Sequence, residues 1–478
     1  MERHPDSGAD VTQMDSGQLQ GLRAAGQLTA RDLLAASMAR IESSGVNAVR
    51  AVNPDAWAMA EASDDRQRHG ALLGPLDGIP VLVKDNIDTG DQMPTTAGSV
   101  ALEGSRAQAD AFLVRQLRRS GAVLVGKANL TEWANWMADH MPAGYSSLGG
   151  QVLNPYGPGR WKVGGSSSGS GAGVATGVAT LAIGTETSGS ILSPASSNGI
   201  VGVKPTVGLI SRRGIAPISW SQDTAGPMAR TVADAALLLQ VLAGRDRGDR
   251  ATWAQPAIPT YTSALAADAL EGVRLGVPRR GYWDRLRGER RGAGDRALVA
   301  LERLGATLVD VDLTTWREMP GRDVLRYEFK PAINAYLARR HGAAVRTLTE
   351  LIRFNKAHEA RALAYGQAVL LASEGTRGDL TEAAYWSARR DDLRCSREEG
   401  IDRALGEHGL SALVFEGNMG AGIAAKAGYP SVTVPAGYTA EGKPVGLTFA
   451  GTAWTEGVLL GLAFAFEQGT LARVAPRG

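Results

Sequence analysis

Residues 164–205 read GGSSSGSGAGVATGVATLAIGTETSGSILSPASSNGIVGVKP, with Gly/Ser turns at 164–171 and 187–190. Between the turns lie a segment of small residues and the short apolar run 181–183. Glycine permits tight turns and lets backbone N–H groups approach a ligand closely. A flexible Gly/Ser linker would lack the apolar residues found between the turns. The stretch therefore predicts one compact helix–strand unit flanked by two serine-bearing turns.

Length and composition narrow the class of protein. A chain of 478 residues can form about three domains, or one large α/β domain with insertions. The net charge of +2 gives no overall field for nucleic acid or membrane, so we expect neither as a partner. The single cysteine, Cys395, excludes an internal disulfide, and we interpret it as structural. The polar N-terminus and the lack of a long apolar run lead us to expect a cytoplasmic protein.

Helix and strand patterns alternate along much of the chain, which is typical of α/β architecture. An apolar run between Gly/Pro turns predicts a buried strand at 79–83, and a helix at 110–120 leads into a strand at 122–125. Thr29 and Asp32 predict a capping box at the start of a helix over 29–43. Further segments are expected to be a Trp- and Met-rich helix at 128–141, a loop at 215–230, a helix at 231–243, a strandless helical region at 316–408, and strands at 412–415, 431–434 and 445–449.

Lys84 directly follows the strand predicted at 79–83. On its own, a lysine at a strand end is most often a surface residue whose ammonium group reaches water. Residues 121–128 come close to a phosphate-binding loop, but the intervening segment is itself a strand. Ala128 also stands where a Ser or Thr would hold Mg²⁺. We therefore exclude nucleotide binding at this segment.

The serine-bearing turns indicate acyl transfer, and three interpretations compete. Residues 165–169 match the G-x-S-x-G pattern of Ser-His-Asp hydrolases, but no convincing strand precedes them. The candidate histidines His341, His358 and His408 lie in or beside the helical region. A dinucleotide site is disfavoured because the glycines miss the G-x-G-x-x-G spacing. The third interpretation uses a neutral lysine as the base, provided that burial lowers its pKa.

Several motifs together resemble the amidase signature family over most of the chain, most densely at residues 76–243. Their order, and the 24-residue gap from Ser166 to Ser190, match that family. The peptide amidase subgroup is the most similar in its motifs. The matching segments are GIPVLVKDN at 78–86, GKANLTEW at 126–133, GGSSSG at 164–169, GTETSGSI at 184–191, VKPTVGL at 203–209 and DTAGPMAR at 223–230.

The resemblance implies a serine hydrolase with a Ser-Ser-Lys triad. It assigns Ser190 as the nucleophile, Ser166 as the bridging serine after a cis Gly165–Ser166 peptide, and Lys84 as the base. It implies an oxyanion hole made by the backbone N–H groups of Thr187, Ser188, Gly189 and Ser190. No metal or organic cofactor is implied. The fold implied is α/β, with a central mixed twisted β-sheet covered by helices on both faces.

The sequence departs from the family pattern around the nucleophile. Glu186-Thr187-Ser188-Gly189 stands where many members have Asp-x-Gly-Gly, and Leu192 stands where many members have Arg. The loss of that Arg argues against small acidic substrates. The Glu-Thr form resembles the peptide amidase subgroup, although that subgroup usually has Asp at the position of Ser188.

The substrate is expected to be a small molecule bearing an amide. By resemblance the segment after Thr131 and the region 316–410 form the pocket, and an aromatic-rich lining favours bulky, aryl or peptidyl amides. Aryl carbamates or anilides are the runner-up, and the glutaminase subunit of an amidotransferase complex is a second alternative. We expect a monomer or homodimer. The candidate pocket residues are Trp136, Met137, Met141, Gly165 and Trp220, with Trp133 beside them.

The chain is expected to form one compact domain made of four parts. Residues 1–70 supply N-terminal helices, and 71–315 supply the core with the candidate catalytic residues. Residues 316–410 form a mainly helical insertion or cap near the substrate entrance. Residues 411–478 add strands and a helix that complete the core.

Overall fold

A computed structural model describes residues 10–319, 321–340 and 342–477. Its main feature is an eleven-stranded mixed sheet, which confirms the predicted α/β fold with a central mixed sheet. From one edge to the other its strands are β1 (Val49–Val52), β3 (Val123–Ala128), β2 (Pro80–Lys84), β6 (Leu181–Glu186), β8 (Thr224–Ala229), β7 (Val201–Lys204), β12 (Ser431–Tyr438), β13 (Pro444–Ala450), β11 (Ala412–Glu416), β9 (Arg274–Pro278) and β10 (Thr307–Val311).

The strand directions bring Lys84, at the end of β2, close to the second Gly/Ser turn, which follows β6. β2 runs parallel to β3 and β6, with Val83 opposite Ile183. The C-terminal ends of β2 and β6 therefore lie side by side. In open α/β sheets, ligands commonly bind outside the carboxyl ends of the strands. β6 in turn pairs antiparallel with β8 over its whole length.

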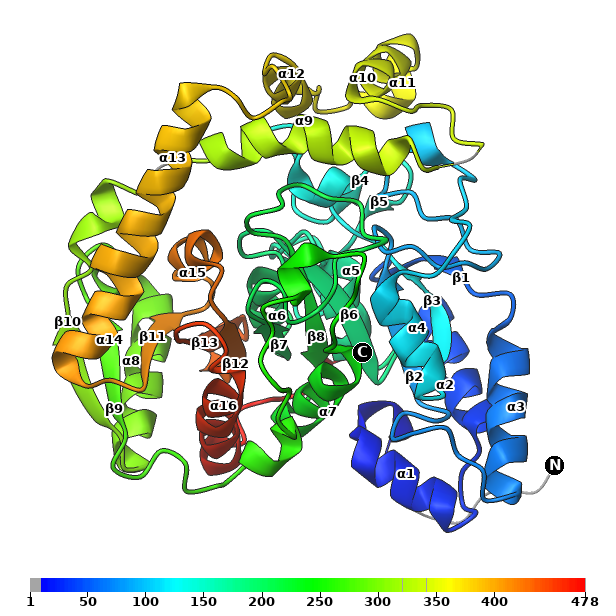
Figure 1. Cartoon of the computed structure of the whole chain (residues 1–478). Helices are drawn as coiled ribbons and strands as arrows, with labels where there is room; N and C mark the ends of the chain where they lie inside the picture. Colours follow the sequence, from blue (N-terminus) through cyan, green and yellow to red (C-terminus); the bar gives the residue numbers. More distant parts are fainter. Residues whose placement is uncertain (1–9, 320, 341, 478) are drawn as a thin grey trace.

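Helices cover both faces of the sheet because its central strands are buried on both sides (Figure 1). Val81 and Val83 of β2 pack into one apolar cluster with α4, α7 and α16, whereas Leu82 packs into another with α2 and α5. The helices are α1 (Ser16–Ala24), α2 (Ala30–Ser43), α3 (Ala56–Arg68), α4 (Phe112–Arg119), α5 (Ser168–Ala175), α6 (Leu192–Ser197), α7 (Val232–Leu242), α8 (Gly288–Arg303), α9 (Asp323–Leu337), α10 (Leu348–Ala357), α11 (Glu359–Ala362), α12 (Ala368–Glu374), α13 (Ala383–Leu393), α14 (Asp402–His408), α15 (Ala421–Ala427) and α16 (Glu456–Thr470).

The N-terminal part contains the predicted helices together with a strand that the sequence did not indicate. The capping box predicted at Thr29 is present, since its hydroxyl accepts from the N–H of Asp32 and the Asp32 carboxylate accepts from the N–H of Thr29. Residues 49–52 form β1, which pairs antiparallel with β3 at the edge of the sheet. A four-residue edge strand is too short for its side-chain pattern to stand out in the sequence.

The helix expected at 128–141 is wrong. β3 extends through Ala128, and the chain then makes a short 3₁₀ turn over Glu132–Asn135. Trp133, Ala134 and Asn135 have φ angles of 49°, 53° and 72°, in the left-handed region that an α-helix excludes. The apolar spacing of this segment instead serves packing against the helical region, as described below.

The loop expected at 215–230 is also wrong in its second half. Residues 224–229 form β8, a central strand paired with both β6 and β7. The sequence TAGPMA does not predict a strand, because Gly and Pro are rare in central strands. Gly226 is required there, since a Cβ at this position would lie 2.0 Å from the backbone oxygen of Val203.

The region 316–408 is helical, as predicted, and contributes no strand among its described residues. α9 runs across the top of the molecule in Figure 1, and α13 descends along one side of it. Cys395 is buried in a π-helical segment, Arg394–Ile401, that joins α13 to α14.

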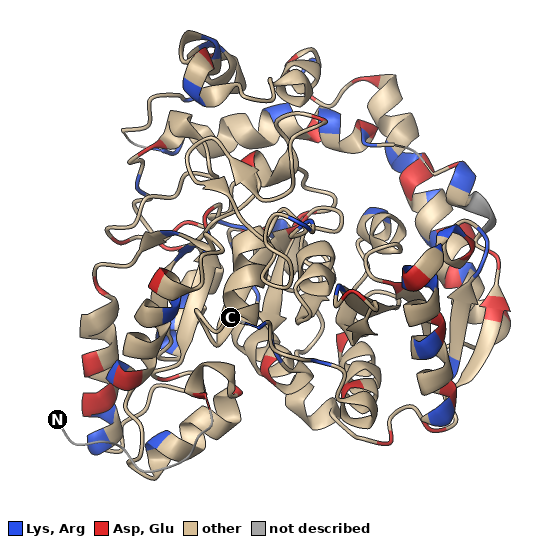
Figure 2. Ribbon diagram, turned by 180° about the vertical axis from the view of Figure 1, so that it is seen from behind, with Lys and Arg blue, Asp and Glu red and all other residues tan. Residues whose placement is uncertain are grey.

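In the described part of the chain, no helix has the length and apolar character needed to cross a bilayer. Figure 2 shows charged residues of both signs mixed over the outer helices.

Candidate active site

Lys84 is the last residue of β2, and its side chain is fully buried. Its Nζ donates hydrogen bonds to Ser166 Oγ at 2.8 Å and to Thr185 Oγ1 at 2.8 Å, with Thr185 O at 3.2 Å. Burial disfavours the ammonium form and lowers the pKa of Lys84 to about 7, although the nearby carboxylates of Glu186 and Asp223 oppose this shift. A large fraction of this amine is therefore neutral near neutral pH and able to accept a proton.

Ser166 lies in the first Gly/Ser turn, directly before α5, and is fully buried. The Gly165–Ser166 peptide bond is cis, as the sequence resemblance implied. The following residue joins the two turns, because Ser167 N–H donates to Ser190 O at 3.1 Å and Ser167 Oγ donates to Thr185 O at 3.1 Å. The two serine-bearing turns are therefore held together as one unit.

Ser190 ends the second turn, and Glu186 folds back to support that turn. The Glu186 carboxylate accepts the backbone N–H groups of Gly189 and Ile191 at 2.7 Å each, and that of Leu192 at 3.0 Å. This corrects one prediction, because the Gly189 N–H already donates to Glu186 and is not free for an oxyanion. In the described part of the chain, the N–H groups of Thr187, Ser188 and Ser190 have no protein acceptor.

Thr187 is held from the opposite side by the segment before β8. Its hydroxyl donates to Asp223 Oδ1 at 2.5 Å, and its carbonyl accepts from Gln222 Nε2 at 3.1 Å. Asp223 Oδ2 accepts two further backbone N–H groups, from Ile218 and Ser219. Burial raises the pKa of Asp223 to about 6, while these hydrogen bonds favour its charged form.

Comparison with known proteins places this arrangement in a family. A family model described as Amidase matches residues 32–398. The chain belongs to the amidase signature family. A probable amidase of Arabidopsis thaliana is 39% identical over 446 residues, which cover 90% of this chain and 85% of that protein. The chain is therefore an amide-hydrolysing enzyme.

Two further relatives are similar over nearly the whole chain. The solved structure of the native peptide amidase from Stenotrophomonas maltophilia is 45% identical, with a TM-score of 0.91, and the match covers 97% of this chain and 98% of that one. A glutamyl-tRNA(Gln) amidotransferase subunit of Chloroflexus aurantiacus is 36% identical over 479 residues, covering 94% of this chain and 95% of that protein.

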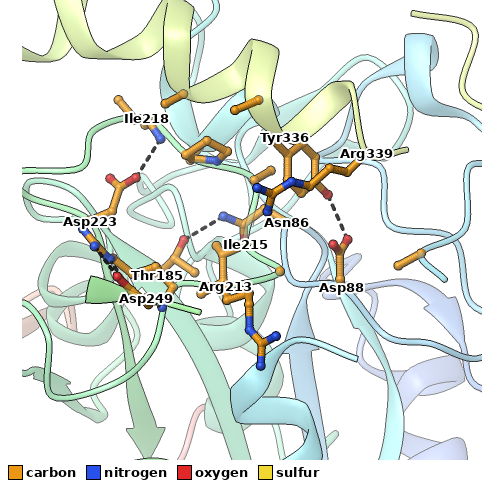
Figure 3. Close-up of a pocket in the computed structure, with 18 of the residues that line it drawn as sticks. Asn86, Asp88, Thr185, Arg213, Ile215, Ile218, Asp223, Asp249, Tyr336 and Arg339 are labelled. Atoms are coloured by element: carbon orange, nitrogen blue, oxygen red, sulfur yellow. Dashed lines mark hydrogen bonds and ion pairs between the residues drawn. The ribbon is translucent and has the colours of Figure 1, made fainter. Parts of the chain in front are cut away.

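A cavity of about 500 Å³ is lined by Thr185, Glu186 and Thr187, next to the candidate triad residues. Asn86 and Thr185 form part of its wall, and Figure 3 shows α9 above them, with Tyr336 extending from α9 and Arg339 from the turn that follows it. Thr185 Oγ1 accepts from both Lys84 Nζ and Asn86 Nδ2 and so stands between the cavity and the lysine. Apolar residues such as Ile215 share the wall with several arginines and aspartates, so the lining is less apolar than the sequence suggested.

The predicted pocket residues of this amidase are found in different environments. Trp136, Met137 and Met141 are buried with Trp133 in an apolar cluster that includes Phe329 of α9. Trp136 Nε1 also donates to Ser373 Oγ at 3.1 Å. Their contact with substrate stays a prediction.

Trp220 is 45% exposed and lines the cavity, and the partly exposed Gly165 precedes Ser166. Of the histidines considered, His341 lies outside the described residues. His358 contacts the carbonyl of Phe354 through Nδ1, and His408 ends α14.

The residues that support the candidate triad were not predicted from the sequence. Thr185 and Asp223 fall inside matched motifs and Gln222 directly precedes one, but nothing in their spacing assigned them a contact. Glu186 stood out only as a departure from the family pattern. Its nearness to a glycine turn was the one signal that it could accept backbone N–H groups.

Proposed function

We propose that this amidase cleaves the terminal carboxamide of peptidyl or other bulky acyl groups through an acyl-enzyme on Ser190. The observation that carries the proposal is the buried hydrogen bond between Lys84 Nζ and Ser166 Oγ. A general base must lie within hydrogen-bond reach of the proton that it receives. A lysine with a pKa near 7 is suited to that role at neutral pH.

In the acylation step, neutral Lys84 takes the proton of Ser166 while Ser166 takes that of Ser190. The Ser190 oxygen forms a bond to the carbonyl carbon, and the carbonyl oxygen becomes an oxyanion. The N–H groups of Thr187, Ser188 and Ser190 are the candidate donors to it, and removing one such donor typically costs about 10²–10³ in kcat. The proton then returns through Ser166 to the leaving nitrogen, and the C–N bond breaks to release ammonia.

In the second half of the reaction, water replaces the leaving amine. Lys84 accepts a proton through Ser166 as the water oxygen attacks the acyl carbon. The ester bond to Ser190 breaks, and Ser190 regains a proton by the same path. This sequence needs no redox partner and leaves the enzyme as it began.

Peptidyl amides are preferred here because the S. maltophilia peptide amidase is similar over nearly the whole chain. The mixed polar and apolar cavity wall also suits a peptide better than a purely hydrocarbon group. Aryl carbamates and anilides are a second candidate, supported by the exposed Trp220 at the same cavity. The same triad could act on a carbamate, which differs from an amide by an alkoxy group.

A direct comparison of substrates tests this proposal. The purified chain is assayed with a C-terminal peptide amide, the same peptide as a p-nitroanilide, an aryl carbamate and free glutamine. We expect the highest kcat/KM for the peptide amide. A preference for the carbamate would support the second candidate. Glutamine hydrolysis alone, seen only when a partner protein is added, would instead favour the glutaminase alternative suggested by the C. aurantiacus relative.

A further inference from the structure

The helical region is tied to the segment before β8 by one buried carboxylate, Glu328 of α9. Glu328 Oε2 accepts from the Ser221 N–H at 2.9 Å and from the Ser219 hydroxyl. Its Oε1 accepts from the Tyr385 hydroxyl of α13 at 2.8 Å and from the Ser221 hydroxyl. Glu328 is only 1% exposed, so these contacts replace the water that would otherwise solvate it.

The four contacts of Glu328 come from uncharged donors, three hydroxyl groups and one backbone N–H. Hydrogen bonds to a carboxylate are stronger than bonds between neutral groups, and each has a preferred direction. Since two of the four donors belong to Ser221 and one to Ser219, Glu328 fixes the backbone of residues 219–221 relative to α9 and α13. The same short segment continues directly into Gln222 and Asp223.

The far end of that segment holds the turn before Ser190. Gln222 is 1% exposed and donates to the carbonyl of Thr187, while Asp223 accepts from the Thr187 hydroxyl. In a trans peptide the C=O and the following N–H point to opposite sides of the chain. By holding the carbonyl of Thr187, Gln222 therefore also sets the direction of the Ser188 N–H, which has no protein acceptor within the described residues.

We propose that Glu328 is a positioning residue, through which the helical region fixes the Thr187–Ser188 peptide for stabilisation of the oxyanion. The inference rests on the proposed acyl-enzyme mechanism at Ser190. It gives the helical region a role beyond covering the sheet. Contacts with α9 and α13 fix the backbone of residues 219–221. The adjacent Gln222 then fixes the Thr187–Ser188 peptide through its hydrogen bond to the carbonyl of Thr187.

Loss of Glu328 should affect kcat more than KM, because the Ser188 N–H is proposed to contact the oxyanion. A misdirected Ser188 N–H weakens an interaction made in the transition state more than one made with bound substrate. Such a loss lowers kcat and kcat/KM together and leaves KM nearly unchanged. Since loss of a whole oxyanion donor costs about 10²–10³ in kcat, we expect Glu328→Ala to lower kcat by at least about 10-fold.

The test compares Glu328→Ala, Glu328→Gln and Gln222→Met with Glu374→Gln as a matched control. Glu374 of α12 is also a carboxylate of the helical region, but its contacts to Thr349 and Lys330 stay within that region. Glu328→Gln keeps one acceptor oxygen and should be milder than Glu328→Ala. Gln222→Met keeps the length of the side chain but removes the donor to Thr187. We expect Glu374→Gln to match the wild type in kcat.

Each protein is assayed for kcat and KM on the best substrate of the panel described above. The inhibition constants of a peptide aldehyde and of the matching peptide carboxylate are also measured. The aldehyde adds to Ser190 and places an oxyanion in the hole, whereas the carboxylate reports binding without addition. We expect the Glu328 and Gln222 variants to bind the aldehyde at least about 10-fold more weakly, with carboxylate binding within about 2-fold of wild type.

Two results would overturn the inference. One is a kcat for Glu328→Gln and Gln222→Met equal to that of the control. The other is a Glu328→Gln/Gln222→Met double variant whose fold-loss in kcat equals the product of the two single-variant losses. Independent groups give that product, whereas two groups that act through the same peptide do not. If Glu328→Ala does not fold, Glu328→Gln and the double variant carry the test. If wild-type Ser190 is not acylated by any substrate or by a p-nitrophenyl ester, the proposed function itself fails, whatever the variants show.

Discussion

Lys84 Nζ and Ser166 Oγ lie 2.8 Å apart, and both side chains are fully excluded from solvent. β2 supplies the lysine and the turn before α5 supplies the serine, 82 positions apart in the chain. Burial makes this contact chemically useful, because it favours the uncharged amine that can accept a proton. The same burial makes Lys84 costly for the fold, since an amine without water must rely on a few fixed acceptors.

Replacing Lys84 with Met should separate catalysis from stability. We expect Lys84→Met to lower kcat by about 10²–10⁴, the usual contribution of a general base, on any substrate that the wild type cleaves. Its melting temperature should stay the same or rise, because an apolar side chain of similar length replaces a buried amine.

Lys127→Met is the matched control for that variant. Lys127 is equally buried, with a pKa lowered by burial to about 8, but it donates to Thr95 Oγ1 and to the carbonyl of Ile87. Lys127→Met should spare turnover, and its melting temperature should stay the same or rise for the same reason as that of Lys84→Met. If Lys127→Met were the inactive variant and Lys84→Met the active one, the assignment of the base would be wrong.

The pH dependence of activity should follow the deprotonation of Lys84. Since its pKa is lowered to about 7, kcat/KM should fall by about tenfold per pH unit below that value and level off above it. Asp223 titrates nearby, because burial raises its pKa to about 6. Asp223→Asn distinguishes the two groups, since an acid limb that persists in this variant belongs to the lysine, with its midpoint moved below that of the wild type because the Asp223 charge no longer raises the pKa of Lys84. A profile that is flat from pH 5.5 to 8 would contradict the prediction.

The same lysine should make stability depend on pH in the alkaline range. Its pKa is about 7 in the folded chain and 10.5 as the ordinary value, so the unfolded chain binds more protons between these pH values. Stability rises with pH wherever the unfolded state binds more protons. The melting temperature of Lys84→Met minus that of wild type should therefore shrink from pH 7 to pH 10. A difference that grows over this interval would contradict the sign.

Glu186 should be needed both for stability and for turnover. Glu186→Ala would leave the buried N–H groups of Gly189, Ile191 and Leu192 without their acceptor. We expect the free energy of unfolding to fall by about 1–3 kcal/mol and kcat to fall with it, because the turn carrying Ser190 loses its support. Glu186→Gln keeps one acceptor oxygen and should give a smaller loss of both. Denaturant unfolding and steady-state kinetics check the two effects, and an unchanged kcat in Glu186→Ala would contradict this role.

The sequence predicted the parts of the site that depend on local pattern. The strand at 79–83 and the two Gly/Ser turns were visible as an apolar run and as glycine clusters, and the family resemblance assigned Lys84, Ser166 and Ser190. The contacts between these parts were not visible. Glu328 reaches residues 219–221 from more than 100 positions away in the chain. No local periodicity marks a carboxylate whose partners are hydroxyl groups on another segment.

The two wrong secondary-structure predictions have different physical causes. In 128–141, the apolar spacing suited a helix, but packing against α9 is achieved by a turn with three left-handed residues from Trp133 onward. Tertiary contacts therefore outweighed local propensity. In 224–229, Gly226 and Pro227 looked like loop residues, but the close approach of β7 requires a residue without a side chain.

The close approach of β7 to Gly226 can be tested directly. A Cβ at this position would lie 2.0 Å from the backbone oxygen of Val203, and backbone cannot move aside as a flexible side chain can. Gly226→Ala should therefore separate β8 from β7 and lower the melting temperature sharply or prevent folding. Gly21→Ala is the control, since a Cβ on Gly21 in α1 would meet no atom within 4 Å beyond its chain neighbours and the nearby backbone of its own helix, and should add up to about 1 kcal/mol of stability through helix propensity. Circular dichroism and thermal melts of both variants provide the measurement, and a Gly226→Ala protein that melts like wild type would contradict the placement of β8 between β6 and β7.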